Sequence, residues 1–518
     1  MKRIFLSITF SVFSIVAFSQ VRWEVIINDN NLDYYGITSC LSYDGGLLIA
    51  AKTQDINTHV FKLDRNGMVL WHKTILLHNS WLSIIRIKQN ANGEILLSGN
   101  TNDKAILIMI DPCGEPIWCN LFENTNHYQS VEYHDAAFLE NGDVIALTWL
   151  YTINDKYDVA ITSFDKDGNF LWFNPFSLYE TLYLPLPFQM QSFDDFVIIT
   201  GDCYSAYPDN PNVVYLRPLI VKTDNNYKKE WVLTYGMSDT ILGDARGVVS
   251  FDGNIFHGFG SYTKLGFGSY NSILLNFDIN GIETSYIGID NVEINPSVTE
   301  NFFLGLEQRD DTSYFASAKF GNAGWENPFG EWIMDTAGHI FQYQSHENTT
   351  GGFMPLHKYI DNKFQLTYQL NYSDILLYKL NPDLSQAPFD TTHHVYDSLC
   401  DHPIVSDTIY LIGCDVITGI EDAPSPEQYY TSLKTIPLHV SPNPATGSVS
   451  FEMENTAYHK NIVLQVFGIN GNRVFEQSLA DGQTVISTSV DNWPDGLYVA
   501  VASSSTGGTG SAKFLVKK

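Results

Sequence analysis

The sequence predicts an all-β chain, with a seven-bladed β-propeller over residues 20–395 and a small, immunoglobulin-like β-sandwich over residues 436–518. Two observations predict this fold: a strand–turn–strand motif recurs every 46–59 residues, and the C-terminal part has short alternating strands with Asn-Gly and Asp-Gly turns. The 518 residues are 44% hydrophobic, which is ample for packed cores. A formal charge of −29 argues against nucleic acid as a partner.

Residues 1–19 have the three parts of a secretory signal peptide. Lys2 and Arg3 precede an apolar run to Phe18, and small residues at Ala17 and Ser19 place cleavage before Gln20. The apolar run is about 15 residues long, whereas a membrane span takes about 20. We therefore expect an exported, monomeric chain with no transmembrane segment.

The repeat is clearest in three segments, residues 60–71, 107–118 and 161–172, which run from a strand through an Asp-Gly turn to a tryptophan. Asp opens such a turn by accepting backbone N–H groups, Gly supplies a positive φ, and Trp packs on the returning strand. A second hairpin lies upstream of each copy, so each repeat has the four strands of a propeller blade. The turn residue recurs at Asp64, Asp111, Asp165, Asp224, Asp278, Asp335 and Asn381.

The N-terminal strand is expected to close the propeller. Residues 21–26 resemble the fourth strand of a repeat, although no repeat precedes them, and the seventh copy lacks that strand. Its addition to the last blade would remove both open edges. An eight-bladed ring and a non-closing array are the alternatives. The pattern resembles quinoprotein-like and related Trp-containing propeller repeats, a resemblance that implies fold and not function.

Six cysteines can form disulfides in an exported protein. Short spacing favours the pairs Cys400–Cys414 and Cys113–Cys119, the first of them within a Cys-bridged connector and linker at residues 396–435. Cys40 and Cys203 lie in apolar, strand-like runs and are expected to be buried free thiols. No Cys/His spacing typical of a metal site is present in the sequence, so none is predicted.

Four motifs occur in order near the C-terminus: Pro442-Asn443-Pro444, the hairpin at residues 467–471, Gly496-Leu497-Tyr498, and the end at residues 513–518. Together they resemble the type A C-terminal sorting domain of Bacteroidetes type IX secretion cargo. The resemblance implies that residues 436–518 engage the type IX secretion machinery and are then removed, leaving a released or surface-attached protein. A generic immunoglobulin-like domain is the alternative.

Catalytic signatures such as HExxH, GxSxG and the P-loop are absent from the sequence, so we expect a binding propeller more than an enzyme. Long aromatic loops in repeats four to six suit recognition of a glycan or protein, although these rings could instead pack the loops together. A secreted glycoside hydrolase, lyase or quinone-dependent dehydrogenase is the alternative. Residues 165–169 have oxygen ligands at calcium-loop spacing but lack the distal Glu, so we expect no cofactor, with calcium as the alternative. The candidate ligand-binding residues are Tyr204, Tyr207, Tyr215, Tyr262, Phe267, Tyr270, Trp325 and Phe329.

Overall fold

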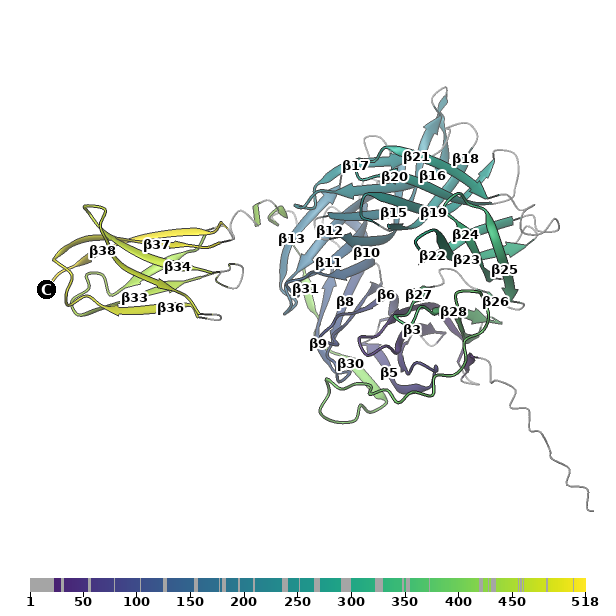
Figure 1. Cartoon of the computed structure of the whole chain (residues 1–518), viewed down its shortest axis with the longest axis horizontal. Helices are drawn as coiled ribbons and strands as arrows, with labels where there is room; N and C mark the ends of the chain where they lie inside the picture. The colour runs from purple at the N-terminus through teal and green to yellow at the C-terminus, as the bar shows by residue number, and fades with distance from the viewer. Residues whose placement is uncertain are drawn as a thin grey trace, which may run out of the picture. The chain divides into compact units, whose positions relative to one another are not determined.

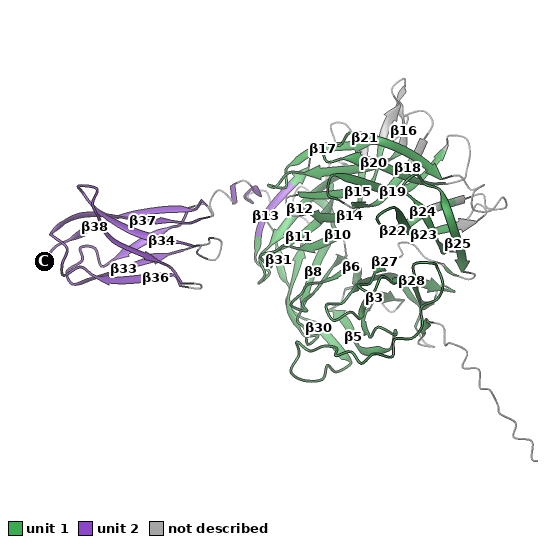
Figure 2. Ribbon diagram, viewed as in Figure 1, with its two compact units in different colours: residues 1–170, 175–420 green, residues 171–174, 421–518 purple. Residues whose placement is uncertain are grey.

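The computed structural model divides the chain into two compact units, residues 1–170 with 175–420 and residues 171–174 with 421–518 (Figure 2). The predicted signal peptide lies outside the described residues. The structure describes residues 23–28, 32–54, 57–78, 80–102, 104–123, 128–152, 157–176, 178, 183–193, 196–207, 210–234, 241–250, 252–264, 271–289, 300–321, 329–346, 349–350, 355–371, 373–418, 423–426, 428–429, 435–454, 456, 459, 461–480, 483–505 and 507–518.

The first unit is a ring of seven sheets, its blades (Figure 1). Blade 1 contains β2 (Tyr34–Leu41), β3 (Leu47–Thr53), β4 (Thr58–Leu63) and β5 (Val69–Leu77). Blade 2 contains β6 (Ser83–Gln89), β7 (Ile95–Thr101), β8 (Lys104–Ile110) and β9 (Pro116–Phe122). Blade 3 contains β10 (Tyr128–Phe138), β11 (Val144–Thr152), β12 (Tyr157–Phe164) and β13 (Phe170–Phe176).

The remaining blades follow in chain order. Blade 4 contains β14 (Tyr183–Phe193), β15 (Phe196–Tyr207), β16 (Asn210–Thr223) and β17 (Lys229–Thr234). Blade 5 contains β18 (Ile241–Ser250), β19 (Ile255–Lys264), β20 (Asn271–Asp278) and β21 (Glu283–Ile289). Blade 6 contains β22 (Glu300–Asp310), β23 (Ser313–Gly321), β24 (Phe329–Asp335) and β25 (Ile340–His346). Blade 7 contains β26 (Thr349–Thr350), β27 (Leu356–Lys358), β28 (Phe364–Leu370), β29 (Asp374–Leu380) and the N-terminal β1 (Glu24–Ile27).

Strand β1 closes the ring as predicted. It pairs antiparallel with β29, from Glu24 opposite Tyr378 to Ile27 opposite Ile375. The buried Trp23 indole just before it donates a hydrogen bond of 3.1 Å to the carbonyl of Arg65 in blade 1. Seven blades and this closure confirm the predicted propeller over its eight-bladed and open alternatives.

The predicted Asp turn joins the last two strands of the blades. In blade 1, one carboxylate oxygen of Asp64 accepts the backbone N–H groups of Asn66 and Met68, both at 2.8 Å. Gly67 completes this turn at φ 77°. The fourth and seventh copies keep the geometry without glycine, since Tyr227 and Leu384 take φ values of 56° and 61°.

A strap formed by residues 388–418 packs on the propeller where the sequence suggested a connector. It adds β30 (Asp407–Leu411) in parallel to β5 and β31 (Asp415–Ile417) in parallel to β9, so blades 1 and 2 each gain a fifth strand (Figure 1). Ile409 and Leu411 of β30 are buried in the core shared by these two blades.

Two disulfides fix the strap, but the predicted pairs Cys400–Cys414 and Cys113–Cys119 are wrong. Cys113 pairs with Cys400 and Cys119 with Cys414. The reason is that the strap runs along β5 and β9 instead of turning back on itself, so each strap cysteine meets a blade 2 cysteine. Cys40 and Cys203 are buried free thiols, as predicted.

The second unit contains a β-sandwich, as predicted for residues 436–518. One sheet has β32 (Leu438–Ser441), β33 (Ser448–Met453) and β36 (Val485–Ser489). The other has β35 (Arg473–Ser478), β34 (Val463–Gly468), β37 (Gly496–Ser503) and β38 (Thr509–Val516). The two sheets share one core, in which Phe451 of β33 packs edge-on against Phe514 of β38.

Candidate functional site: the propeller channel

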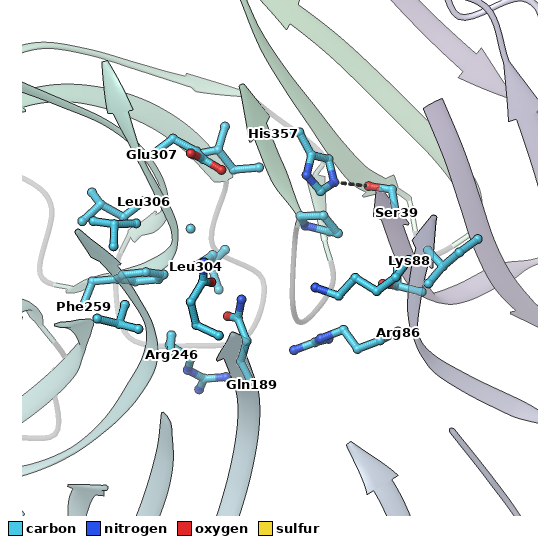
Figure 3. Close-up of a pocket in the computed structure, with 18 residues that line it drawn as sticks. Ser39, Arg86, Lys88, Gln189, Arg246, Phe259, Leu304, Leu306, Glu307 and His357 are labelled. Carbon is cyan, nitrogen blue, oxygen red and sulfur yellow. Dashed lines mark hydrogen bonds between the residues drawn. The ribbon is translucent and has the colours of Figure 1, made fainter. Parts of the chain in front are cut away.

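The first strands of six blades surround one cavity of about 280 Å³ (Figure 3). Its walls come from β2, β6, β14, β18, β22 and β27, with Phe259 added from β19. In a propeller the first strand of each blade lies nearest the axis, so this cavity, called the channel cavity below, is the place where residues from most of the ring can meet a single ligand.

One side of the channel cavity is basic. Arg86 and Lys88 are two residues apart on β6, so both side chains leave the same face of the strand and point into the cavity, opposite Gln189 (Figure 3). Arg246 enters from β18, with its guanidinium over the ring of Phe188. Two backbone carbonyls fix the Arg86 guanidinium: Nη1 donates to Ile85 at 3.2 Å and Nη2 donates to Phe188 at 2.9 Å.

Two acids support these cations from outside the cavity lining. Asp244 accepts from Arg246 at 2.5 Å, and Asp135 lies 3.9 Å from the Lys88 ammonium. The oxygens of Asp135 also accept the backbone N–H groups of Ala136 at 2.9 Å and Met190 at 3.0 Å. Asp135 therefore divides its negative charge between backbone donors and Lys88.

The other side of the cavity holds groups that are neutral or partly neutral near pH 7. Burial raises the pKa of Glu307 to about 7, against a smaller opposing effect of Lys358. Burial also lowers the pKa of His357 to about 4, and the charge of Lys88 adds to this effect. Nearby, burial and the charge of Asp244 raise the pKa of Asp202 to about 7. Such perturbed groups around a cavity are typical of functional sites.

Bulges place the cavity residues. The pairing of the first and second strands shifts register at an equivalent point in blades 1 to 6, for example between Ile84 and Arg86, between Pro187 and Gln189, and between Ala245 and Gly247. A bulge turns the side chains that follow it, and bulges are frequent beside active sites. Arg86, Gln189 and Arg246 all lie at these shifts and line the cavity.

None of the sequence-predicted aromatic residues that the structure describes lines the channel cavity. Tyr262 and Phe329 are buried in blade cores and are not among the residues that line the channel cavity. Tyr204 is half-buried on β15. Tyr207 on β15 and Tyr215 on β16 belong to strands, but their side chains lie outside the described part of the chain, as do Phe267, Tyr270 and Trp325 entirely.

Sequence reasoning missed the cavity residues, of which Arg86, Lys88, Gln189, Arg246 and Glu307 are the most polar. The signal that could have found them is the presence of charged and amide side chains inside the first strand of the repeats, where neighbouring positions are apolar. Aligning the first strands of the copies would have shown that polar residues recur in these strands, which a propeller places near its axis.

Comparisons with known proteins identify the C-terminal part. Residues 439–517 match the family model of the secretion system C-terminal sorting domain. No curated protein matches the chain. The chain is therefore a β-propeller protein that is exported and is secreted or attached at the cell surface. The sorting domain also implies an interaction with the type IX secretion machinery. Among the described residues, none of the helices has the length and apolar character needed to cross a membrane.

Solved structures resemble the chain only remotely. A protein of unknown function from Bacteroides caccae is 10% identical, with a TM-score of 0.30, covering 51% of this chain and 84% of that one. A Lactobacillus plantarum protein is 11% identical, with a TM-score of 0.39, covering 61% and 85%. The extracellular domain of a putative one-component system from B. thetaiotaomicron is 12% identical, with a TM-score of 0.24, covering 93% and 69%. At these scores the likenesses say nothing of function.

Proposed function

We propose that the propeller is a binding module that holds a glycan or protein ligand outside the cell, with the channel cavity as its central site. The observation that carries this proposal is the convergence of polar side chains from six blades on one cavity. Amide, hydroxyl and charged groups beside apolar walls are the usual composition of a ligand site.

The cavity composition favours binding over glycoside cleavage. Glycosidases use two carboxyl groups that flank the scissile bond. Among the residues that line the cavity in the described part of the chain, Glu307 is the only carboxylic acid. A single acid among cations and amides can orient a ligand, but it does not supply the pair that hydrolysis needs.

The test is retention of the full-length secreted chain on a glycan array and in pull-downs with surface proteins. Gln191→Trp places a large side chain at an exposed position of the cavity wall and should reduce retention at least tenfold. Gln342→Trp, at an exposed position on β25 of blade 6 outside the cavity lining, is the matched control and should leave retention unchanged. Absence of retention on every polymer, or equal retention of both variants, would overturn the proposal.

The loops of blades 4 to 6 form a second part of the proposed surface, which rests on their sequence. Tyr204 is half-buried on β15, and in the sequence Tyr270 and Trp325 come between β19 and β20 and between β23 and β24, outside the described residues. Flat aromatic rings would add contacts to a polymer that extends beyond the cavity. Unchanged retention of Tyr270→Ala and Trp325→Ala on every polymer that the chain binds would remove these loops from the site.

A further inference from the structure

The channel cavity carries more positive charge than the chain as a whole would suggest. The chain has 29 basic against 58 acidic residues, yet Arg86, Lys88 and Arg246 line one cavity with Glu307 as the only lining acid among the described residues. A site that concentrates the scarcer sign of charge favours ligands of the opposite sign, because nearby low-dielectric walls strengthen the attraction.

Four acids lie at or behind the lining of the channel cavity: Asp135, Asp202, Asp244 and Glu307. Asp244 is engaged by Arg246 and also accepts the backbone N–H of Ser261 at 2.9 Å and its hydroxyl at 2.8 Å. Asp135 is shared between two backbone N–H groups and Lys88 at 3.9 Å. Burial, the largest cause, raises the pKa values of Asp202 and Glu307 to about 7, so both acids are partly protonated at neutral pH and largely protonated below it. Below pH 7 the three cations therefore outnumber the ionised acids. The low pKa of His357, caused by burial and then by Lys88, agrees with a positive potential here.

We propose that the channel cavity binds an acidic saccharide, with the carboxylate of a uronic acid residue placed between Arg86 and Lys88. This inference rests on the proposed binding function and names its ligand class. A guanidinium offers a carboxylate two parallel N–H donors, and an ammonium adds a charged hydrogen bond. Both side chains point into the open space from the same face of β6 (Figure 3).

The rest of the lining suits a sugar. Gln189 and Gln191 can both donate and accept hydrogen bonds, as sugar hydroxyls require. Phe259 and Leu306 form an apolar wall against which the C–H face of a sugar ring can pack. A volume of about 280 Å³ lies at the lower end of ligand pockets, which suits one or two sugar residues at the end of a polymer.

Isothermal titration of the full secreted chain with galacturonic acid and its disaccharide, against galactose and galactobiose, tests this inference. We expect at least tenfold tighter binding of the acidic sugars, weakening as salt is added. Lys88→Gln should lower the affinity for the acidic disaccharide about tenfold. Lys104→Gln is the matched control, because Lys104 lies in the same blade, is 34% exposed against 38% for Lys88, and pairs with Glu123 outside the cavity lining.

Arg86→Lys distinguishes recognition from simple attraction, because it keeps the charge but loses the paired donors; it should weaken acidic sugars more than neutral ones. Melting curves of all variants check that they fold. Equal affinity for acidic and neutral sugars, or binding of acidic peptides without acidic sugars, would overturn the inference and leave the proposed binding function standing. No retention of the chain on any glycan or protein would overturn both.

Discussion

At the residue scale, Glu307 couples the channel cavity to pH. Burial raises its pKa from 4.5 to about 7, so between these values the folded chain binds a proton that the unfolded chain releases. The contribution of Glu307 to the free energy of unfolding is therefore greatest below pH 4.5 and is lost as pH rises through 7.

Glu307→Gln carries no charge at any pH. We expect the stability of this variant minus that of the parent chain to be about 1–3 kcal/mol larger at pH 8 than at pH 5. Thermal midpoints of both chains at the two pH values measure this difference. Glu140→Gln, at an exposed turn position, serves as the matched control. An unchanged difference between Glu307→Gln and the parent at pH 5 and pH 8 would contradict the effect of burial.

The turn glycines illustrate a second residue-scale effect, the packing of one blade on the next. Gly168 has φ 84°, and a Cβ atom there would lie 2.7 Å from the ring of Trp118 in blade 2. The same indole donates a 3.1 Å hydrogen bond to the carbonyl of Lys166. Gly253 has a similar φ of 72°, but no atom lies within 4 Å of its Cβ position.

Gly168→Ala and Gly253→Ala should therefore differ in stability by the cost of displacing Trp118. Both substitutions carry the strain of a positive φ, about 1 kcal/mol. Gly168→Ala must also move the indole, for which we expect a further 1–3 kcal/mol. Thermal or urea unfolding of the two variants measures this difference, and equal losses would show that the Trp–turn contact adds nothing to blade packing.

At the element scale, ion pairs join the strap to blade 1 and disulfides join it to blade 2. The buried Lys62 ammonium lies 2.9 Å from Asp44 of blade 1 and 3.2 Å from Asp397 of the strap. Lys73 lies 2.8 Å from Asp407 of β30. A lysine buried in this way needs its carboxylate partners, because an unpaired buried charge is strongly destabilising.

Peptide mapping of the unreduced chain should recover the pairs Cys113–Cys400 and Cys119–Cys414, each closing a loop of nearly 300 residues. Replacing Cys119 and Cys414 together by Ser should lower stability by about 2–5 kcal/mol, because the bond restricts the unfolded chain. Replacing the free thiols Cys40 and Cys203 by Ala tests whether loss of cysteine alone has this effect. Recovery of Cys113–Cys119 or Cys400–Cys414 would contradict the strap.

The elements that could be predicted from the sequence are those defined by local contacts. The Asp turns need only residues two and four positions apart, so their pattern repeats visibly, and β1 could be recognised by its likeness to other fourth strands. The disulfide pairs could not be predicted by spacing, because parallel pairing of the strap joins residues 287 and 295 positions apart. The channel cavity depends on bulges, which shift side chains by one position without a fixed sequence pattern.

At the scale of the whole molecule, the end of the propeller is set by the strap. The strap belongs with the blades in the first compact unit, which extends to Ile420, whereas the sorting-domain match begins at residue 439. Removal of the sorting domain near the linker would therefore leave both disulfides and strands β30 and β31 in place.

Two truncations test this boundary. A chain that ends after residue 420 should keep the propeller's thermal midpoint within a few degrees and retain any ligand bound by the channel cavity, because every strand of the ring is present. A chain that ends after residue 395 loses residues 396–418 of the strap, and with them the buried Ile409 and Leu411 and both disulfides. Its midpoint should fall by at least about 10 °C, since 1 kcal/mol corresponds to roughly 2–4 °C in domains of 150–250 residues. Equal midpoints for the two truncated chains would show that the strap is dispensable and that the propeller ends with blade 7.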